Sequence, residues 1–336
     1  MPRRAVLSYV VVALGLIAAI VLRLLVGSGG AWLPDHEVLA AVLELRALRV
    51  VMGVVVGGSL GAAGAVLQSL LRNPLAAPDL LGVSAGASLA VVIAGWVSAG
   101  SGAALGAAAS TAAALTWQGG PALLGAGTAL ALVYVLAQRR GLLDPIQLVL
   151  TGVVVSIMCG AGILLIQHLS GGLALVSSRV LIGELSDDWD WPPVLIFAGV
   201  SLAVTIFCAR LGHSMDAATL GDDEATSLGV RLGRLRAALF ISSGLFTACA
   251  VALAGPVGFV GLVAPHLARL STGMQGGHRA LLILSWLIGA AIVVGGDALI
   301  KAVHLGAGRL PLGILTAILG GPALLVLLRR EARRRS

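Results

Sequence analysis

Long apolar runs recur along almost the whole chain, and they constrain its fold more than any other feature. A helix needs roughly 20 apolar residues to cross the hydrocarbon core of a bilayer. Runs of about this length lie at residues 5–26, 47–71, 82–99, 119–138, 145–168, 192–210, 235–254, 280–300 and 311–328. The chain is therefore predicted to be an all-α polytopic membrane protein.

The composition excludes the other broad classes of protein. Apolar residues make up 58% of the chain and charged residues only 11%, whereas soluble domains carry about 25% charged residues. Disorder is excluded as well, because disordered segments are poor in the apolar residues that are abundant here. No polar stretch is long enough to form a soluble domain. Residues 1–336 are thus predicted to form a single transmembrane domain.

Two segments fit the pattern of spans less simply. Residues 257–270 are apolar but too short to cross the membrane at full thickness, and we expect a half-helix bracketed by Pro256 and Pro265 and packed inside the protein. Counting this half-helix gives about ten transmembrane helices. The stretch 100–118 is rich in Gly, Ala, Ser and Thr, and it either extends the third span or forms an external excursion.

The basic residues predict the orientation of the spans. The chain has 21 arginines, one lysine and a formal net charge of +7, and the positive-inside rule places the most basic segments in the cytoplasm. Ten spans with cytoplasmic termini satisfy this rule, with residues 1–4 and the basic tail 329–336 inside. The loop 169–191 then lies outside, and its Trp189 and Trp191 are expected at the membrane interface.

Glycine is the next informative residue type, because the chain contains 46 glycines. Gly57 and Gly61 lie four residues apart, as do Gly82 and Gly86. Helices in lipid associate largely through close packing of small residues. We therefore interpret such pairs as packing contacts, with sliding helices of a transport path as the alternative.

Signatures of catalysis or metal binding are missing from the sequence. There is no Walker A loop, HExxH or GxSxG, and Cys159, Cys208 and Cys249 are isolated in apolar runs, as expected of inert buried thiols. No catalytic residue and no metal site is predicted. Asp297 is the one acid placed firmly within a span, and a local ion pair with Lys301 is expected because the two share a helical face.

Three motifs carry a resemblance to a known family. The first begins at Arg46-Ala-Leu-Arg49 and, after an apolar span, continues from Gln68 to Gly86 with Asn73, Pro74, Pro78 and Gly82. The second runs over 254–269 and contains Pro256, Gly258, Pro265 and His266, and the third runs over 309–322 and contains Pro311 and Gly313. In this order, over residues 5–330, they resemble the FecCD family, the permease subunits of ABC importers for ferric siderophores, haem and vitamin B12. The prolines also fit the break after the second span, since proline cannot continue a helix.

The resemblance implies a fold, an activity and partners. The fold would be the type II importer subunit (B12-permease-like), working as a homodimer or a paralogous heterodimer in the bacterial cell membrane. Two cytoplasmic ATPase subunits would bind ATP and Mg²⁺, an extracytoplasmic binding protein would deliver the substrate, and this chain would bind no cofactor. The expected cargo is a ferric siderophore or related iron chelate, with haem or cobalamin as the alternative.

The alternatives from other functional classes are an ion-coupled secondary transporter and a membrane enzyme. An ion-coupled secondary transporter would need intramembrane coupling acids, and a membrane enzyme would need a polar catalytic cluster. Neither feature is visible in the sequence. His266 is interpreted as a packed or hydrogen-bonded residue, since a single histidine without partners seldom binds a metal.

A short surface helix is predicted at 220–228. Thr219 and Asp222 fit a capping box, three acids follow in the first turn, and Gly229 fits a C-terminal cap. The resemblance implies that this helix couples to the ATPase, and a solvated connector is the alternative. The residues assigned to coupling are Leu220, Gly221, Glu224, Ala225, Leu228 and Gly229.

Docking and pathway residues are also assigned by resemblance. Arg46, Arg49, Lys301 and Arg309 match outer positions that receive acidic residues of the binding protein, with interfacial snorkelling as the alternative. The sequence departs from the family in two places: Arg46-Ala-Leu-Arg49 lacks the usual proline, and Arg309 replaces the usual acid. On the fifth and tenth spans, the expected pathway-lining residues are Ser156, Cys159 and Thr316.

Overall fold

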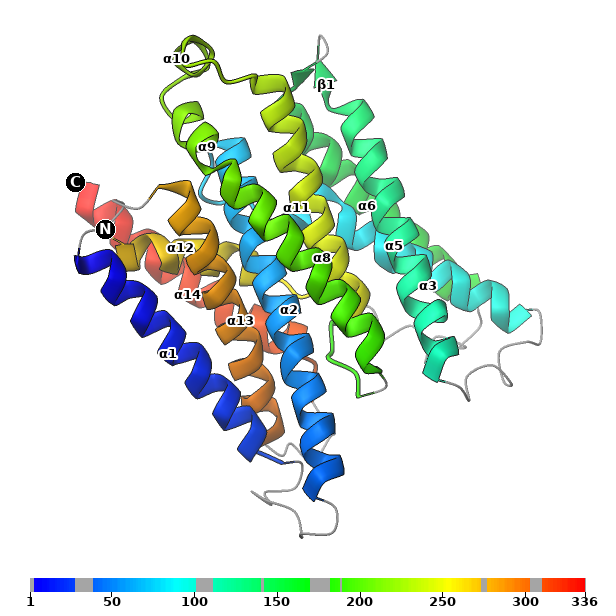
Figure 1. Ribbon diagram of the computed structural model, residues 1–336. Coiled ribbons are helices and arrows are strands. Elements are labelled where there is room, and N and C mark those ends of the chain that lie inside the picture. Colours follow the sequence, from blue (N-terminus) through cyan, green and yellow to red (C-terminus); the bar gives the residue numbers. More distant parts are fainter. Residues whose placement is uncertain are drawn as a thin grey trace.

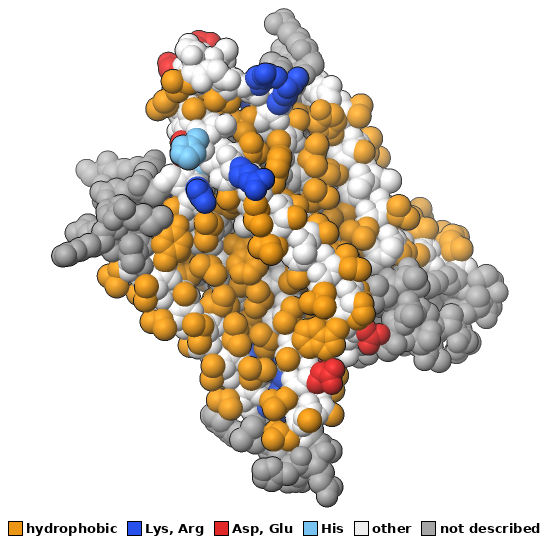
Figure 2. Space-filling view, in the orientation of Figure 1, with side chains coloured by type: hydrophobic (Ala, Val, Ile, Leu, Met, Phe, Trp, Pro, Cys, Tyr) orange, Lys and Arg blue, Asp and Glu red, His pale blue; other side chains and the backbone are white. Residues whose placement is uncertain are grey.

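A computed structural model describes residues 3–27, 39–100, 111–139, 142–169, 182–187, 189–272, 277–302 and 310–335. Long helices run side by side in a bundle (Figure 1), and the short elements α10 and β1 both lie at the same end of it. Figure 2 shows hydrophobic side chains over the length of one face, with most of its visible Lys and Arg toward the α10 end. Apolar side chains on this outer surface fit contact with lipid.

Ten long helices make up the described part of the bundle. They are α1 (Arg3–Leu25), α2 (Leu39–Leu71), α3 (Val83–Gly100), α5 (Thr111–Leu136), α6 (Pro145–Leu169), α8 (Trp191–Arg210), α11 (Leu232–Ala254), α12 (Val260–Thr272), α13 (His278–Ala302) and α14 (Leu312–Arg335). Each predicted run corresponds to one of them. By length and composition alone, 7 described helices could cross a membrane, and shorter apolar helices lie at Val83–Val97 and Leu312–Pro322.

Short elements connect these helices. They are η1 (Pro78–Leu81), the two-residue strands β1 (Gln138–Arg139) and β2 (Leu142–Leu143), α9 (Gly212–Ala218) and α10 (Asp222–Ser227). The strands pair antiparallel, with Gln138 opposite Leu143. In the ambiguous stretch 100–118, α5 already begins at Thr111, while residues 101–110 lie outside the described residues.

Helix α2 forms the centre of the core, and α11 and α13 pack against it. Glycine permits this closeness: a Cβ atom added at Gly57 would lie 2.2 Å from the carbonyl oxygen of Gly289, and one at Gly61 would lie 2.1 Å from that of Ser285. At Gly86, an added Cβ would lie 2.5 Å from the Cβ of Ala129. The predicted packing role of these small residues is confirmed, because only glycine fits such backbone contacts.

The predicted turn after the second span is confirmed. The side chain of Asn73 accepts a hydrogen bond from the Leu75 amide at 2.9 Å, and Pro74 follows the end of α2. Pro78 then begins the one-turn helix η1, and Gly82 ends it with φ of +73°. A Cβ at Gly82 would lie 3.0 Å from the side chain of Val155 in α6. Both backbone shape and space therefore require glycine there.

The expectation that Pro265 ends the half-helix is wrong. Helix α12 runs from Val260 to Thr272 and contains Pro265 in its interior. Proline has no amide hydrogen, so the carbonyl of Gly261, four residues earlier, loses its helical partner. The side-chain amide of Gln68 donates to this carbonyl at 3.5 Å. A neighbouring helix thus satisfies the freed group, and α12 continues through the proline.

The second and third motifs meet through the segment 182–187. The Glu184 amide donates to the Ala254 carbonyl at 2.8 Å, and the Gly313 amide donates to the Gly183 carbonyl at 3.0 Å. A Cβ at Gly313 would lie 2.1 Å from the carbonyl oxygen of Ile182 and 3.2 Å from that of Pro256. This segment therefore ties the end of α11 to the beginning of α14.

One tryptophan of the loop 169–191 is not where the sequence placed it. Trp189 is buried, at 7% exposure, and packs edge-on against Phe197 with ring centroids 6.4 Å apart. Trp191 begins α8, and its indole N–H donates to Glu44 at 3.3 Å. Trp189 thus anchors the segment before α8 to the core instead of presenting its ring on the surface.

Candidate functional site

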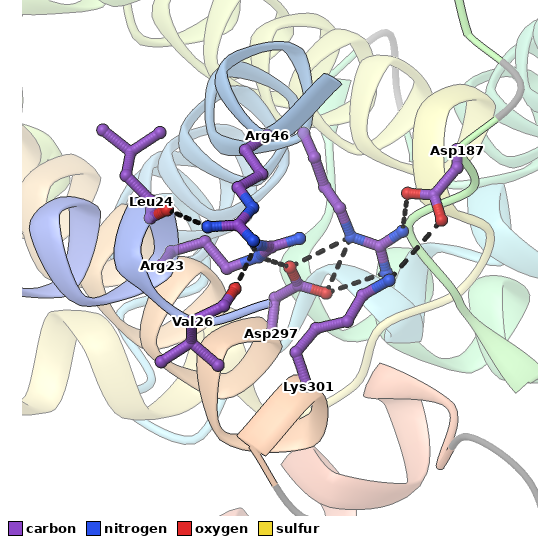
Figure 3. A network of polar contacts seen from close by, with 8 residues as sticks. Arg23, Leu24, Val26, Arg46, Asp187, Asp297 and Lys301 are labelled. Carbon is purple, nitrogen blue, oxygen red and sulfur yellow. Dashed lines mark hydrogen bonds and ion pairs between the residues drawn. The ribbon is translucent and has the colours of Figure 1, made fainter. Parts of the chain in front are cut away.

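A buried cluster of charged residues joins α1, α2 and α13 at the end of the bundle away from α10. We call it the ion cluster, and Figure 3 shows it. At its centre, Asp297 of α13 accepts hydrogen bonds from Arg49 Nε at 3.0 Å and Arg49 Nη2 at 2.9 Å, and it pairs with Arg23 Nε. All three side chains are almost fully buried. The full cluster contains Arg23, Arg46, Arg49, Asp187, Asp297 and Lys301.

Arg46 closes the end of α1. Its Nη1 atom donates to the carbonyl oxygens of Leu24 at 2.6 Å and Leu25 at 3.1 Å. These carbonyls belong to the last turn of α1, where no further helical amide is available to bind them. A cation there also complements the negative end of the helix dipole. Arg46 therefore ties the end of α1 to α2.

Asp187 bridges the other side of the cluster. Its carboxylate pairs with Arg49 Nη1 and lies 3.5 Å from Lys301 Nζ. Burial alone would raise the pKa of Asp187, but Arg49 and Lys301 outweigh it and hold that pKa below its ordinary value. The side chain of Asp187 is 48% exposed, whereas that of Asp297 is 4% exposed. One guanidinium, that of Arg49, thus links a buried and an accessible carboxylate.

The expected local ion pair of Asp297 with Lys301 is wrong. Asp297 binds Arg23 and Arg49 from two other helices, and Lys301 binds Asp187. The sequence shows neighbours four residues apart, whereas these partners are 248 and 274 residues away from Asp297. Arg46, Arg49 and Lys301 are also nearly buried, at 8%, 5% and 6% exposure. They are not an exposed cationic rim, and Arg309 lies outside the described residues.

The short helix at the opposite end differs in part from its prediction. Helix α10 covers Asp222–Ser227, and Gly221 with φ of 148° precedes it as the N-cap. The capping box is wrong, because Thr219 ends α9 and its hydroxyl donates to the Asp216 carbonyl at 2.7 Å. The three acids do occupy the first turn of α10. A cluster of acids at this terminus suits the helix dipole.

The predicted C-terminal cap is confirmed. Gly229 has φ of +83°, its amide donates to the Thr226 carbonyl at 2.9 Å, and the Val230 amide donates to the Ala225 carbonyl at 3.0 Å. This pair of bonds defines the Schellman motif, which needs a left-handed residue at that position. The helix therefore ends where glycine permits the chain to reverse.

Asp222 ties α10 to the bundle. It pairs with Arg72 at the end of α2 and with Arg236 Nη2 of α11 at 2.7 Å, and Arg72 also donates to the Ala218 carbonyl at 2.6 Å. Burial alone would raise the pKa of Asp222, but the two arginines outweigh it and lower that pKa. We call Arg72, Asp222 and Arg236 the clasp.

Apolar side chains flank α10 on the surface. Leu220 is 66% exposed and Leu228 is 65% exposed, whereas Ala225 is fully buried within the chain. The clasp holds the backbone between the two leucines, so both are presented to the surroundings at the tip of the bundle. Of the residues assigned to coupling, Leu220 and Leu228 are therefore available for a partner, and Ala225 is not.

A second contact links the α10 end of the bundle to α13. Asp216 of α9 accepts a hydrogen bond from the His278 amide at 2.8 Å and pairs with His278 Nδ1 at 2.6 Å. His278 is the first residue of α13, so Asp216 caps that helix from another element. Helix α13 then runs through the bundle to Asp297 and Lys301 in the ion cluster. No sequence signal marked Asp216, Asp187 or Arg23 as a partner of these residues.

The expected pathway residues lie on two helices. Ser156 and Cys159 belong to α6, where the Ser156 hydroxyl donates to the Gly152 carbonyl at 2.9 Å, and Thr316 belongs to α14 and donates to the Gly313 carbonyl at 3.1 Å. Helix α6 also exposes Ile157 and Met158. Their role in a pathway stays a prediction. His266 is buried, and the described residues contain no group of three or more candidate metal ligands.

Comparisons with known proteins agree on one family. Residues 5–330 match the model of the FecCD transport family. The chain is 37% identical to the vitamin B12 import system permease protein BtuC of Vibrio cholerae, covering 96% of this chain and 94% of that protein. It is 36% identical to the ferric dicitrate transport system permease protein FecD of Escherichia coli, covering 87% and 86%.

Two further comparisons extend this result. The hemin transport system permease protein HmuU of Yersinia pestis is 32% identical over 88% of this chain and 84% of its own length. A solved metal-chelate type ABC transporter in an inward-facing conformation is 26% identical, with a TM-score of 0.80 over 97% of this chain and 99% of that one. The three motifs, the helical bundle and these matches agree: the chain is a multi-pass membrane protein of the FecCD transport family.

Proposed function

We propose that the chain is the transmembrane permease subunit of a binding-protein-dependent ABC importer that moves a ferric siderophore or related iron chelate inward. The family match over residues 5–330 carries this proposal. The chain itself would catalyse no reaction and bind no cofactor. Two ATPase subunits with ATP and Mg²⁺ would drive it, a second permease subunit would complete the pathway, and an extracytoplasmic protein would deliver the cargo.

The α10 end supports the coupling part of this proposal. Leu220 and Leu228 are large, apolar and exposed beside a helix that the clasp fixes in place. Apolar anchors on a short helix are the features that dock in a groove of a partner. We assign this end to the cytoplasmic ATPase. The basic residues gathered toward it in Figure 2 agree with a cytoplasmic position under the positive-inside rule.

The cargo assignment rests on the named relatives. Permeases for ferric dicitrate and for ferric enterobactin, both of Escherichia coli, are 36% and 35% identical to the chain. The vitamin B12 permease of Vibrio cholerae is 37% identical, so cobalamin is the specific alternative, and haem follows from the hemin permease. We favour iron chelates because several relatives carry them.

Uptake by the reconstituted complex tests the function. The permease, its ATPase and its binding protein are placed in proteoliposomes, and ATP-dependent accumulation of radioactive iron chelates, haem and cobalamin is measured. Accumulation of an iron chelate above the other two is the expected result. ATP-dependent accumulation of cobalamin or haem alone would reassign the cargo, and ATP-independent uptake driven by an ion gradient would contradict the ABC mechanism.

The coupling role is tested by Leu228→Asp, which places a charge on the apolar surface beside α10. We expect uptake to fall at least about tenfold, because burying an unpaired charge in an apolar groove is strongly unfavourable. Thr226→Asp, which adds the same charge at an exposed position two residues earlier in α10, is the matched control. Ala225→Asp is not a clean test, since Ala225 is buried inside the chain. Wild-type uptake by the Leu228 variant would contradict docking at this surface.

A further inference from the structure

We propose that Asp79 lines the translocation pathway and makes it more favourable for cations than for anions, so that iron chelates of positive or zero net charge are preferred as cargo over anionic ones. The inference rests on the proposed function, because it concerns the pathway that an iron chelate would take. Asp79 lies in the first motif, within η1, and it is exposed. It is not among the residues that the sequence assigned to the pathway.

The chain re-enters the bundle at η1. Leu75, in the turn before it, is 45% exposed, whereas residues 76–78 are buried. The backbone of η1 then packs on α6, because a Cβ at Gly152 would lie 1.9 Å from the carbonyl oxygen of Leu80. A helix rises 1.5 Å per residue, so Gly152 lies about 10 Å along α6 from its first residue. Asp79 is therefore set back inside the bundle from its α10 end.

Asp79 lies between α6 and α14, the two helices predicted to line the pathway. Helix η1 connects it to α6. On the other side, a Cβ at Gly258 would lie 3.9 Å from Asp79 Oδ2. The next residue, Phe259, contacts α14, because a Cβ at Gly320 would lie 2.5 Å from the Cβ of Phe259. Residues 258 and 259 thus connect the carboxylate to α14.

The Asp79 carboxylate has one neutral partner. Its Oδ1 atom accepts a hydrogen bond from the Ser84 hydroxyl at 3.2 Å, and no lysine or arginine among the described residues forms an ion pair with it. An exposed carboxylate within a membrane bundle faces water, because contact with lipid is costly for a charged group. Acidic side chains that line a hydrated path select for cations. Asp79 therefore supplies a negative charge where cargo would pass.

Gly258 offers a position for a chemical reporter. The nearest atom to a Cβ there, outside its chain neighbours, is Asp79 Oδ2 at 3.9 Å, so a cysteine fits beside the carboxylate. In a chain whose native Cys159, Cys208 and Cys249 are replaced, the Gly258→Cys thiol is labelled with a cationic and with an anionic methanethiosulfonate. The assay uses the permease–ATPase complex in nanodiscs at about pH 8, where an accessible carboxylate is ionised. It needs no knowledge of the cargo.

The ratio of cationic to anionic labelling rates is compared between wild-type Asp79, Asp79→Asn and Asp79→Glu. A unit charge about 6 Å away in water attracts one reagent and repels the other enough to change this ratio about tenfold. Asp79→Asn should therefore lower the ratio by about this factor, while Asp79→Glu keeps it. Asparagine retains an oxygen for the bond from Ser84. A control reporter, Thr226→Cys, exposed on α10, should show the same ratio in all three backgrounds.

Two labelling results would overturn the proposal. An unchanged ratio in Asp79→Asn would show that the carboxylate does not act on the space beside Gly258. Failure of the Gly258→Cys thiol to react with either reagent in every nucleotide state, while the Thr226→Cys control reacts, would show that Asp79 does not lie on a hydrated pathway.

Uptake tests the preference for cargo. ATP-dependent accumulation in proteoliposomes is measured for ferric dicitrate, an anion, and for a cationic ferric trihydroxamate. The wild-type complex should favour the trihydroxamate, and Asp79→Asn should raise the relative uptake of ferric dicitrate by up to about tenfold. A wild-type preference for ferric dicitrate, or the same relative uptake in the variant, would overturn the preference. A complex that accumulates neither chelate would contradict the proposed function instead, and the labelling ratio would still decide the role of Asp79.

Discussion

Arg49 holds Asp297 with both arms of its guanidinium, Nε at 3.0 Å and Nη2 at 2.9 Å from the two carboxylate oxygens. This fork-to-fork geometry is available to arginine and not to lysine. It links α2 to α13 near one end of the bundle, at a depth where neither side chain reaches solvent. The pair therefore ties the two helices together at this end.

Asp297→Asn should destabilise the protein strongly. It leaves Arg23 buried without its acid and removes one of the two carboxylates that Arg49 binds. Breaking a buried ion pair from one side costs about 3–5 kcal/mol. The measurement is the free energy of unfolding in mixed detergent micelles. Asp190→Asn, at an exposed carboxylate, should stay within about 0.5 kcal/mol of wild type. A loss below 1 kcal/mol for the Asp297 variant would show that the cluster is not a structural ion pair.

Arg49→Lys and Arg49→Glu separate charge from geometry. Lysine keeps the positive charge but cannot bridge Asp187 and Asp297 with fixed arms, so we expect a moderate loss of about 1–3 kcal/mol. Glutamate adds a third acid to the cluster and should cost more than lysine. The same order is expected for affinity toward the binding protein at low salt, and high salt should narrow the difference. A stability of Arg49→Lys equal to that of the wild-type protein would contradict the bridging role.

Asp222→Asn should loosen α10, because it weakens both contacts of the clasp. Asp223→Asn removes the same charge from the next residue and is the control. Hydrogen exchange of the α10 amides should speed up in the first variant only, and uptake per ATP hydrolysed should fall with it. Since Arg72 and Arg236 lower the pKa of Asp222, the contribution of the clasp should be complete above the ordinary aspartate pKa of about 3.9. It should disappear only as the pH falls through the lower pKa of the folded protein.

Gly57→Ala should destabilise the α2–α13 contact. An added Cβ would lie 2.2 Å from the Gly289 carbonyl oxygen, so the helices must separate, and overpacking of this kind costs about 1–3 kcal/mol. Gly15→Ala, where nothing lies within 4 Å of the added atom, should be neutral or stabilising, because alanine favours helix. Unfolding of the two variants under the same conditions gives the comparison. The interpretation is wrong if Gly57→Ala is as stable as Gly15→Ala.

Cysteine labelling addresses the predicted pathway on α6 and α14. After the three native cysteines are replaced, single cysteines at 156 and 316 should react with a water-soluble maleimide at rates that depend on the nucleotide bound to the ATPase. Thr316 is 7% exposed in this chain, so its labelling in particular requires a conformational change. Equal rates in every nucleotide state would remove these positions from the pathway.

The helices themselves could be predicted from the sequence, because the cost of leaving backbone groups unpaired in lipid makes every long apolar run a helix. The same local reasoning identified the turn at Asn73 to Gly82 and the cap at Gly229, where the local backbone shape favours the residues present. It failed at Pro265, which lies inside α12 because Gln68 of another helix binds the carbonyl that the proline leaves free.

The charged contacts were decided only by the tertiary structure. Arg23, Arg49 and Asp187 meet around one end of α13 from three separate segments, and Asp222 meets Arg72 and Arg236 at the other end of the bundle. A sequence shows which charges are near in the chain, and so it suggested the pair of Asp297 with Lys301. Packing of the helices brings distant residues together. A buried carboxylate then pairs with the cations that surround it in space, because no water is present to solvate it.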